Sequence, residues 1–320
     1  MNPLTHQAGN ITDARTEPEA MRFAGFVTEL RRRGRAPKTI GSYRSDWIGF
    51  TDWFLENEGR AFTIAGLTAG AAEQYRDHLV SKGMRPATVN RKLVFIKRYA
   101  QWALDRMAID AVTYNDLRGV APVAQGPRKP RSLSDIELRR FLREVERRAS
   151  RRDQAIVYCL LETGLRVSEL VALSIDQLTL GARRGCIVVE DVRHHNTRYR
   201  RLSLGGMARR KLRSYVIERG QEPGALFIGE RGALTANAVQ RLLRKYCAFA
   251  KVKVSPSILR HTFANSFLES EGDVVELADL LGHESLETTR LYLTAKIETV
   301  APMVGNKPVR PHVVFQEDAE

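Results

Sequence analysis

The chain has 320 residues, 43% of them hydrophobic and 28% charged, a composition typical of a globular protein that can form two cores. No apolar run approaches the ~20 residues of a membrane-spanning helix, and the first residues lack the basic and apolar segments of a secretory signal. Lys and Arg number 51 against 37 acidic residues, and the net charge of +14 favours a polyanionic partner, nucleic acid first. These features argue against secretion and membrane insertion and favour a cytoplasmic protein.

The cysteines are Cys159, Cys186 and Cys247, an odd number, widely spaced and set in apolar surroundings. This pattern predicts buried thiols in a reducing compartment, because a disulfide framework or a zinc site needs paired or closely spaced ligands.

The amino-terminal half is predicted to contain four helices over residues 16–118, after a flexible lead-in of residues 1–15. Apolar residues recur at three- and four-residue steps, which is the helical period, first in residues 23–30 and then in residues 40–54. Thr39 is placed to cap the second of these helices.

The fourth predicted helix has a basic flank. Arg91 and Arg98 lie seven residues apart, with Lys97 beside them. Such a flank either contacts phosphates or is a solvated charged face.

Residues 119–131 contain three prolines, two glycines and three cations without any apolar period. We expect this segment to be a basic interdomain linker outside either core. Its charge would let it lie along a polyanion while two domains clasp a duplex.

The remaining chain is predicted to form a second, mainly helical domain over residues 132–300, followed by a tail of residues 301–320 with an apolar cluster at 313–315. Residues 187–189 and 200–204 are predicted to form a hairpin, because apolar and polar residues alternate in its second arm. Helix starts are expected at capping residues, namely Ser134 with Glu137, Thr235, Ser255, Asp273 and Ser285.

Several single residues have both a functional and a structural interpretation. Arg166 follows a glycine at a predicted helix start, where its guanidinium could bind an anion with Glu169 holding it in place. Arg260 lies in the first turns of a helix, and His283 lies just beyond a helix end. Taken singly, such an arginine is usually a surface cation, such a histidine a cap, and Tyr292 a core residue.

Four short segments together carry a stronger signal. Their sequences are TGLRVSEL at 163–170, LRHTFA at 259–264, LLGH at 280–283 and TTRLY at 288–292. In this order and spacing they resemble the tyrosine recombinases, or phage-type integrases, and the resemblance extends over almost the whole chain.

The resemblance implies a mainly α fold with a small antiparallel β-sheet. The helical core-binding domain would be residues 16–118 and the α+β tyrosine recombinase catalytic domain residues 132–300. It further implies double-stranded DNA as the partner, a dimer at each crossover site and a synaptic tetramer. No metal, cofactor, membrane or small-molecule substrate is implied.

By the same resemblance, Tyr292 attacks a phosphodiester, forms a 3′-phosphotyrosyl link and releases a 5′-hydroxyl. Arg166 and Arg260 would neutralise the charge that develops on the phosphoryl oxygens, and His283 would be a third donor. The ester would conserve the bond energy for rejoining.

The sequence departs from the family pattern in the hairpin, where the family usually carries a lysine as general acid. No lysine occurs between Lys129 and Lys211, and counting back from the second arm leads to His195, an imidazole that can donate a proton near neutral pH. The neighbouring alternatives are His194, Arg193 and Arg198, and a solvated loop is the structural interpretation.

A second departure is Ser257, three residues before Arg260, where the family has histidine. Serine can donate a hydrogen bond but cannot act as a base near neutral pH, and a helix cap is its structural interpretation. The two departures leave open one alternative to a recombinase, a DNA-binding member of the fold with weak or no catalysis. A second alternative, a relaxing enzyme similar to type IB topoisomerases, would share the cleavage chemistry without requiring two paired sites.

Overall fold

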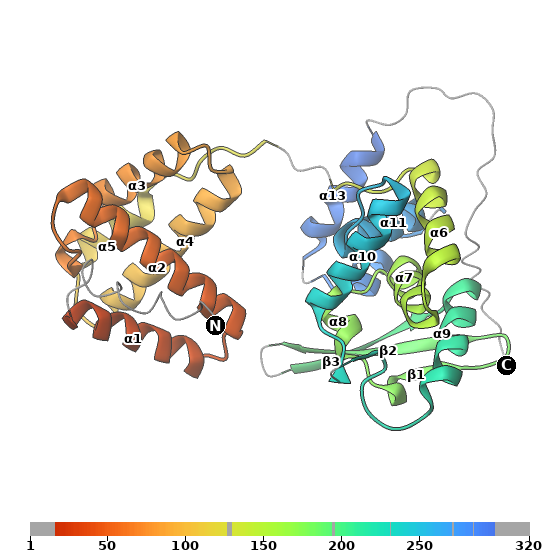
Figure 1. Ribbon diagram of the computed structural model, residues 1–320. Coiled ribbons are helices and arrows are strands. Elements are labelled where there is room, and N and C mark those ends of the chain that lie inside the picture. Colours follow the sequence, from red (N-terminus) through yellow and green to blue (C-terminus); the bar gives the residue numbers. More distant parts are fainter. Residues whose placement is uncertain are drawn as a thin grey trace, which may run out of the picture. The chain divides into compact units, whose positions relative to one another are not determined.

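The computed structural model describes residues 17–126, 130–193, 196–230, 232–270, 272–283 and 285–297 (Figure 1). The chain divides into two compact units, Met1–Arg128 and Lys129–Glu320. Within the described residues, every helix is too short or too polar to cross a membrane. The predicted lead-in, His195 and the tail of residues 301–320 lie outside the described residues.

The first unit is helical. Its elements are α1 Glu17–Arg32, α2 Pro37–Glu58, the 3-10 turn η1 Ile64–Gly66, α3 Ala69–Ser81, α4 Pro86–Leu104 and α5 Ala111–Gly119. Aromatic side chains fill its core, where the ring of Trp47 stacks on Phe23 with centroids 4.7 Å apart and Tyr99 stacks on Trp102 at 5.7 Å. The helical period of the sequence therefore reports the buried face correctly.

Two details of this unit differ from the prediction. Helix α2 begins at Pro37 with Ala36 as its N-cap, so Thr39 is not the cap, because the fixed φ of proline already suits the first helical turn. The unit also contains a fifth helix, α5, capped by Asp110, with Leu117 as its one fully buried apolar residue. A nine-residue helix with so little apolar periodicity gives only a weak sequence signal.

The basic flank of α4 is partly engaged in structural contacts. Lys97 Nζ donates hydrogen bonds of 2.8 and 2.7 Å to the carbonyl oxygens of Arg118 and Val120. Arg91 pairs with the buried carboxylate of Asp46. Among these three cations, Arg98 is exposed to solvent, as a contact with a phosphate requires.

The start of the predicted linker belongs to the first core. Val120 is buried there, and the backbone N–H of Val123 donates a 2.8 Å hydrogen bond to Asn90 Oδ1. The expectation that all of 119–131 lies outside a core therefore differs from the structure, because single valines pack without any helical or strand period. We propose that the rest of this segment is the interdomain linker.

The second unit combines helices with a small sheet. Its helices are α6 Asp135–Arg148, α7 Arg151–Thr163, α8 Val167–Ala172, η2 Ile175–Gln177, α9 Gly206–Arg219, α10 Ala236–Ala250, α11 Pro256–Glu269, α12 Val274–Leu281 and α13 Leu286–Ile297. Its strands are β1 Leu178–Leu180, β2 Gly185–Arg193, β3 Asn196–Ser203, β4 Ile228–Gly229 and β5 Gly232–Ala233. The first three form one antiparallel sheet in the order β1-β2-β3, and the last two form a separate pair.

Local sequence signals located most elements of this unit. The capping box of Ser134 and Glu137 is present, and the side chains of Thr235, Ser255 and Asp273 cap α10, α11 and α12. The hairpin is confirmed as β2 and β3, with residue 188 opposite residue 201. The mainly α fold with a small antiparallel sheet is thus confirmed.

The prediction of buried thiols is confirmed for two of the three cysteines. Cys159 and Cys186 are buried, whereas Cys247 is half-buried, and all three are free thiols. Burial raises the pKa of the Cys159 thiol to about 12, so it stays protonated and unreactive at neutral pH.

Candidate active site

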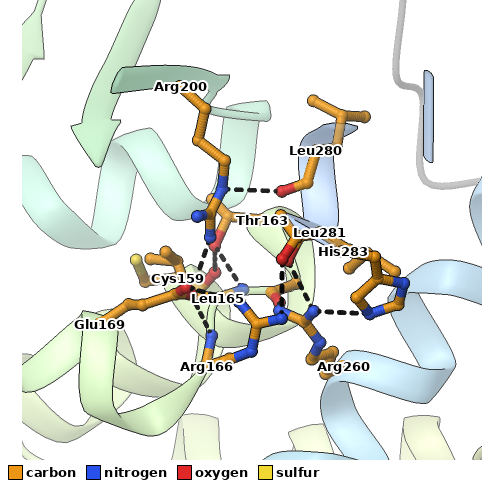
Figure 2. A network of polar contacts seen from close by, with 12 residues as sticks. Cys159, Thr163, Leu165, Arg166, Glu169, Arg200, Arg260, Leu280, Leu281 and His283 are labelled. Carbon is orange, nitrogen blue, oxygen red and sulfur yellow. Dashed lines mark hydrogen bonds and ion pairs between the residues drawn. The ribbon is translucent and has the colours of Figure 1, made fainter. Parts of the chain in front are cut away.

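Three arginines from separate elements meet at residues 280–283, which form the end of α12 and the turn that follows it (Figure 2). Successive backbone carbonyls of residues 280, 281 and 282 accept hydrogen bonds from Arg200 Nε at 3.0 Å, Arg260 Nη2 at 2.7 Å and Arg166 Nη2 at 2.9 Å. Carbonyl oxygens orient the guanidinium groups but carry no full negative charge. The turn therefore gathers positive charge without neutralising it.

One carboxylate, Glu169 on α8, orients two of these arginines. Its Oε1 accepts a 2.8 Å hydrogen bond from Arg166 Nη1, and its Oε2 accepts one of 2.7 Å from Arg200 Nη2. Burial raises the pKa of Glu169, but the hydrogen bonds and charges of Arg200 and Arg166 outweigh burial and hold its pKa below the usual value. Glu169 therefore stays ionised and holds Arg166, as the sequence predicted.

Gly164 lets the end of α7 come close to α11. Its φ is +62°, and a Cβ atom there would lie 2.4 Å from the ring of Phe263 and 2.9 Å from the side chain of Leu281. A side chain at this position would have to displace both neighbours. The Gly164 carbonyl also accepts a 2.7 Å hydrogen bond from Arg260 Nη1, so this turn directly positions the arginine.

Arg260 is the most enclosed cation of the site, with 8% of its surface exposed. Burial, assisted by the charge of Arg166, lowers its pKa to about 10, which still leaves it protonated at neutral pH. Its hydrogen bonds go to Gly164, Leu281 and His283, so among the described residues part of its five-donor fork is left for an anion. Arg166 is about a third exposed, which opens the pair to solvent.

His283 lies just beyond the end of α12, as predicted. Its Nε2 is 3.0 Å from Arg260 Nη2, and its Nδ1 is 2.8 Å from Thr289 Oγ1. Because a guanidinium can only donate, Nε2 accepts and the ring proton is assigned to Nδ1, which donates to Thr289. Both ring nitrogens are therefore engaged in holding the imidazole against Arg260.

Tyr292, on α13, belongs to a small apolar cluster that includes Phe267 and Leu281, and only 4% of it is exposed. Its hydroxyl is 2.6 Å from Nδ1 of His261. Burial raises the pKa of Tyr292, and the charges of Arg260 and Arg166 oppose this rise in part. The core and functional interpretations of Tyr292 are thus compatible.

Two site residues were missed by sequence reasoning. Arg200, on β3, makes its contacts on the strand face shared with Leu202 and Leu204, both buried. An arginine on the same strand face as inward-facing leucines is the sequence signal that could have identified Arg200. His261 was located on its helix but was given no role, because nothing local shows that α13 contacts it.

The two departures from the family pattern differ in what the structure shows. The side chain of Ser257 is exposed, and among the described residues it makes no hydrogen bond. The cap of α11 is Ser255, so the capping interpretation of Ser257 is wrong. His195 and its neighbour His194 lie outside the described residues, so the candidate acid stays a prediction.

Each of the two units matches a known protein-family model. The model of the phage integrase family matches residues 131–298, and the model of the phage integrase N-terminal SAM-like domain matches residues 23–107. A tyrosine recombinase XerD of Ralstonia nicotianae is 30% identical over 273 residues, covering 81% of this chain and 84% of the relative. A tyrosine recombinase XerC of Pelotomaculum thermopropionicum is 29% identical over 286 residues, covering 83% and 91%.

Solved structures show the same fold at low sequence identity. The XerH site-specific recombinase bound to palindromic difH substrate matches with a TM-score of 0.68 at 20% identity, covering 85% of this chain and 82% of that one. A lambda integrase dimer bound to a COC′ core site matches with a TM-score of 0.67 at 14% identity, covering 91% and 99%. The match to the phage integrase family model and the relative at 30% identity show that the chain belongs to the phage integrase family of tyrosine recombinases.

Proposed function

We propose that this chain is a site-specific DNA recombinase that cuts and rejoins DNA through a 3′-phosphotyrosyl intermediate at Tyr292. The observation that carries the proposal is the convergence of Arg166 and Arg260 on one turn, together with the contact between the Tyr292 hydroxyl and His261, the residue next to Arg260. The names of the relatives, tyrosine recombinases XerC and XerD, support the same reaction class.

The charge of the site suits phosphoryl transfer. The charged residues that Figure 2 labels in the network are three arginines and one glutamate, which leaves an excess of positive charge there. Negative charge on the nonbridging oxygens is stabilised by donors that are already fixed in place, and forked guanidiniums bind two such oxygens at once. The arginines would therefore supply charge stabilisation from the protein itself.

The covalent step requires a nucleophile and a leaving group. Tyr292 Oη attacks phosphorus, the bond to the 5′-oxygen breaks, and the departing oxygen takes up a proton. We propose His195 as the donor of that proton, with His194 as the alternative. The phosphotyrosyl ester keeps the bond energy, so the 5′-hydroxyl of a second strand can reverse the reaction.

The decisive experiment is a trapping assay with the full chain. A duplex of the cognate site with a 5′-bridging phosphorothiolate at the scissile position prevents religation, because the released thiol attacks the ester poorly. We expect a covalent protein–DNA adduct that survives denaturing electrophoresis. Tight DNA binding without any adduct would leave the non-catalytic binding protein as the function.

The relaxing-enzyme alternative is separated by the choice of DNA. A recombinase needs two copies of its site for strand exchange, whereas a topoisomerase-like enzyme relaxes supercoiled plasmid that carries no site. Relaxation of such a plasmid at the rate seen with the site present would overturn site-specific recombination.

The assembly follows from the same chemistry. Because exchange joins two duplexes and each cut strand needs one tyrosine, we propose a dimer at each site and a tetramer in the synapse. The lambda integrase structure, a dimer bound to a core site, supports this stoichiometry by analogy. A DNA substrate also supports the cytoplasm as the proposed location of the protein.

DNA affinity should depend steeply on salt. The chain carries a net charge of +14, and each phosphate neutralised by a cation releases counterions. We expect log affinity to fall by about 0.9 per log unit of salt for each phosphate contacted. Fluorescence anisotropy with the cognate duplex between low and physiological salt measures this slope, and a flat response contradicts a DNA-binding role for the basic surface.

A further inference from the structure

The contact between His261 and Tyr292 joins two helices at the reacting atom. The Nδ1–Oη distance is 2.6 Å, and the ring centroids of the two residues are 5.5 Å apart. His261 lies on α11 next to Arg260, whereas Tyr292 lies on α13 with 4% of its surface exposed. Helix α11 thus carries both Arg260, which is proposed to bind the phosphate, and His261, which contacts the proposed nucleophile.

The direction of the hydrogen bond follows from the two titrating groups. Burial and the neighbouring charge of Arg260 lower the pKa of His261, so the imidazole is neutral at pH 7. Burial raises the pKa of Tyr292, with Arg260 and Arg166 opposing it, so the phenol carries its proton. The phenol therefore donates, and His261 accepts at Nδ1 in the tautomer with its proton on Nε2.

We propose that His261 accepts the proton of Tyr292 as the tyrosine attacks DNA, and returns it when the tyrosine leaves. The inference rests on the proposed function of Tyr292. In the forward step the Oη–P bond forms, the P–O5′ bond breaks, and the phenol proton passes from Oη to Nδ1. In rejoining, the ester bond breaks and His261 protonates the released phenolate oxygen.

Other nearby groups are less suited to this proton. Both ring nitrogens of His283 are engaged, by Arg260 and by Thr289. Ser257 lies one helical turn before His261, is exposed, and cannot act as a base near neutral pH. His261 is thus the imidazole that touches the hydroxyl, and the serine at position 257 leaves the proton-accepting role to it.

Single-turnover cleavage of a nicked suicide duplex tests the proposal. We expect His261→Ala and His261→Gln to form adduct about 10²- to 10⁴-fold more slowly near neutral pH, the usual contribution of general acid–base catalysis. Glutamine can keep a hydrogen bond to the hydroxyl but cannot take up its proton. A glutamine variant with the wild-type rate would reduce His261 to positioning the ring and overturn the proposal.

The phosphorothiolate substrate separates the two proton transfers. Its sulfur leaving group needs no protonation, so it should not restore the rate of either His261 variant. Full restoration would show that His261 serves the leaving group and would overturn the proposal. An inactive wild type would instead contradict the proposed function itself. His78→Gln, a histidine change in the first unit, is the matched control and should keep the wild-type rate.

The pH profile of the wild type gives a readout that needs no variant. Protonated His261 cannot accept, so cleavage should fall at acid pH with a midpoint below the ordinary histidine value of 6.5. The His261 variants should instead gain rate as the pH rises, because solvent base then takes the phenol proton. A wild-type rate that is flat from neutral pH into this acid range would overturn the proposal.

Discussion

Tyr292→Phe is expected to reduce covalent adduct formation to background while leaving DNA binding intact. The change removes only the hydroxyl, and the ring can stay in its cluster with Phe267 and Leu281. The lost hydrogen bond to His261 should change the free energy of unfolding by only about 1 kcal/mol. Adduct on the phosphorothiolate duplex and gel-shift affinity measure the two properties.

A matched control is Tyr114→Phe, which removes the hydroxyl of a half-buried tyrosine in the first unit. It should form adduct at the wild-type rate. Adduct formed by the Tyr292→Phe variant, mapped by peptide sequencing to another residue, would show that the nucleophile lies elsewhere in the chain.

Arg260→Lys is expected to slow cleavage by about 10²- to 10³-fold, the usual cost of removing one fixed transition-state donor. Lysine keeps the positive charge but lacks the planar fork that reaches Gly164, Leu281 and a phosphate at once. Arg260→Ala should be worse, because two buried carbonyls would then lose their donors at about 1–3 kcal/mol each. Adduct rate and thermal unfolding together distinguish catalytic loss from destabilisation.

The control for this pair is Arg139→Lys, the same change at an exposed position on α6. It should leave both the cleavage rate and the melting temperature unchanged. Equal activity of Arg260→Lys and wild type would mean that a point charge suffices, and the forked contact to the phosphoryl oxygens would have to be abandoned.

Arg260 and His261 are neighbours in one sequence motif, but the motif predicted a role only for Arg260. The segment LRHTFA marked the arginine through its resemblance to a family, whereas the adjacent histidine gained a role only from its distance to Tyr292. Similarly, Arg200 lies on a strand that alternation predicted, but its partner Glu169 comes from a helix 31 positions earlier. The spacing of residues along the chain does not show which helices and strands pack against one another.

Local signals are short in range, and they determined most of the elements. Capping residues such as Ser134 and Asp273 satisfy amide groups within their own helix turn, so the sequence alone locates those helix starts. Alternation in residues 200–204 likewise determined the inward face of the hairpin. Weakly periodic helices such as α5 were not predicted, because their burial depends on neighbours that the rest of the unit supplies.

The sequence by itself therefore determined the family, the four main candidates for the site and most helix boundaries, because motif order and capping chemistry are properties of the chain. Only the tertiary structure decided that three successive carbonyls collect the arginines and that His261 meets Tyr292. The physical reason is that these contacts depend on how α7, α11 and α13 pack. That packing is set by side-chain volume and close approach, as at Gly164, and has no signature in any single segment.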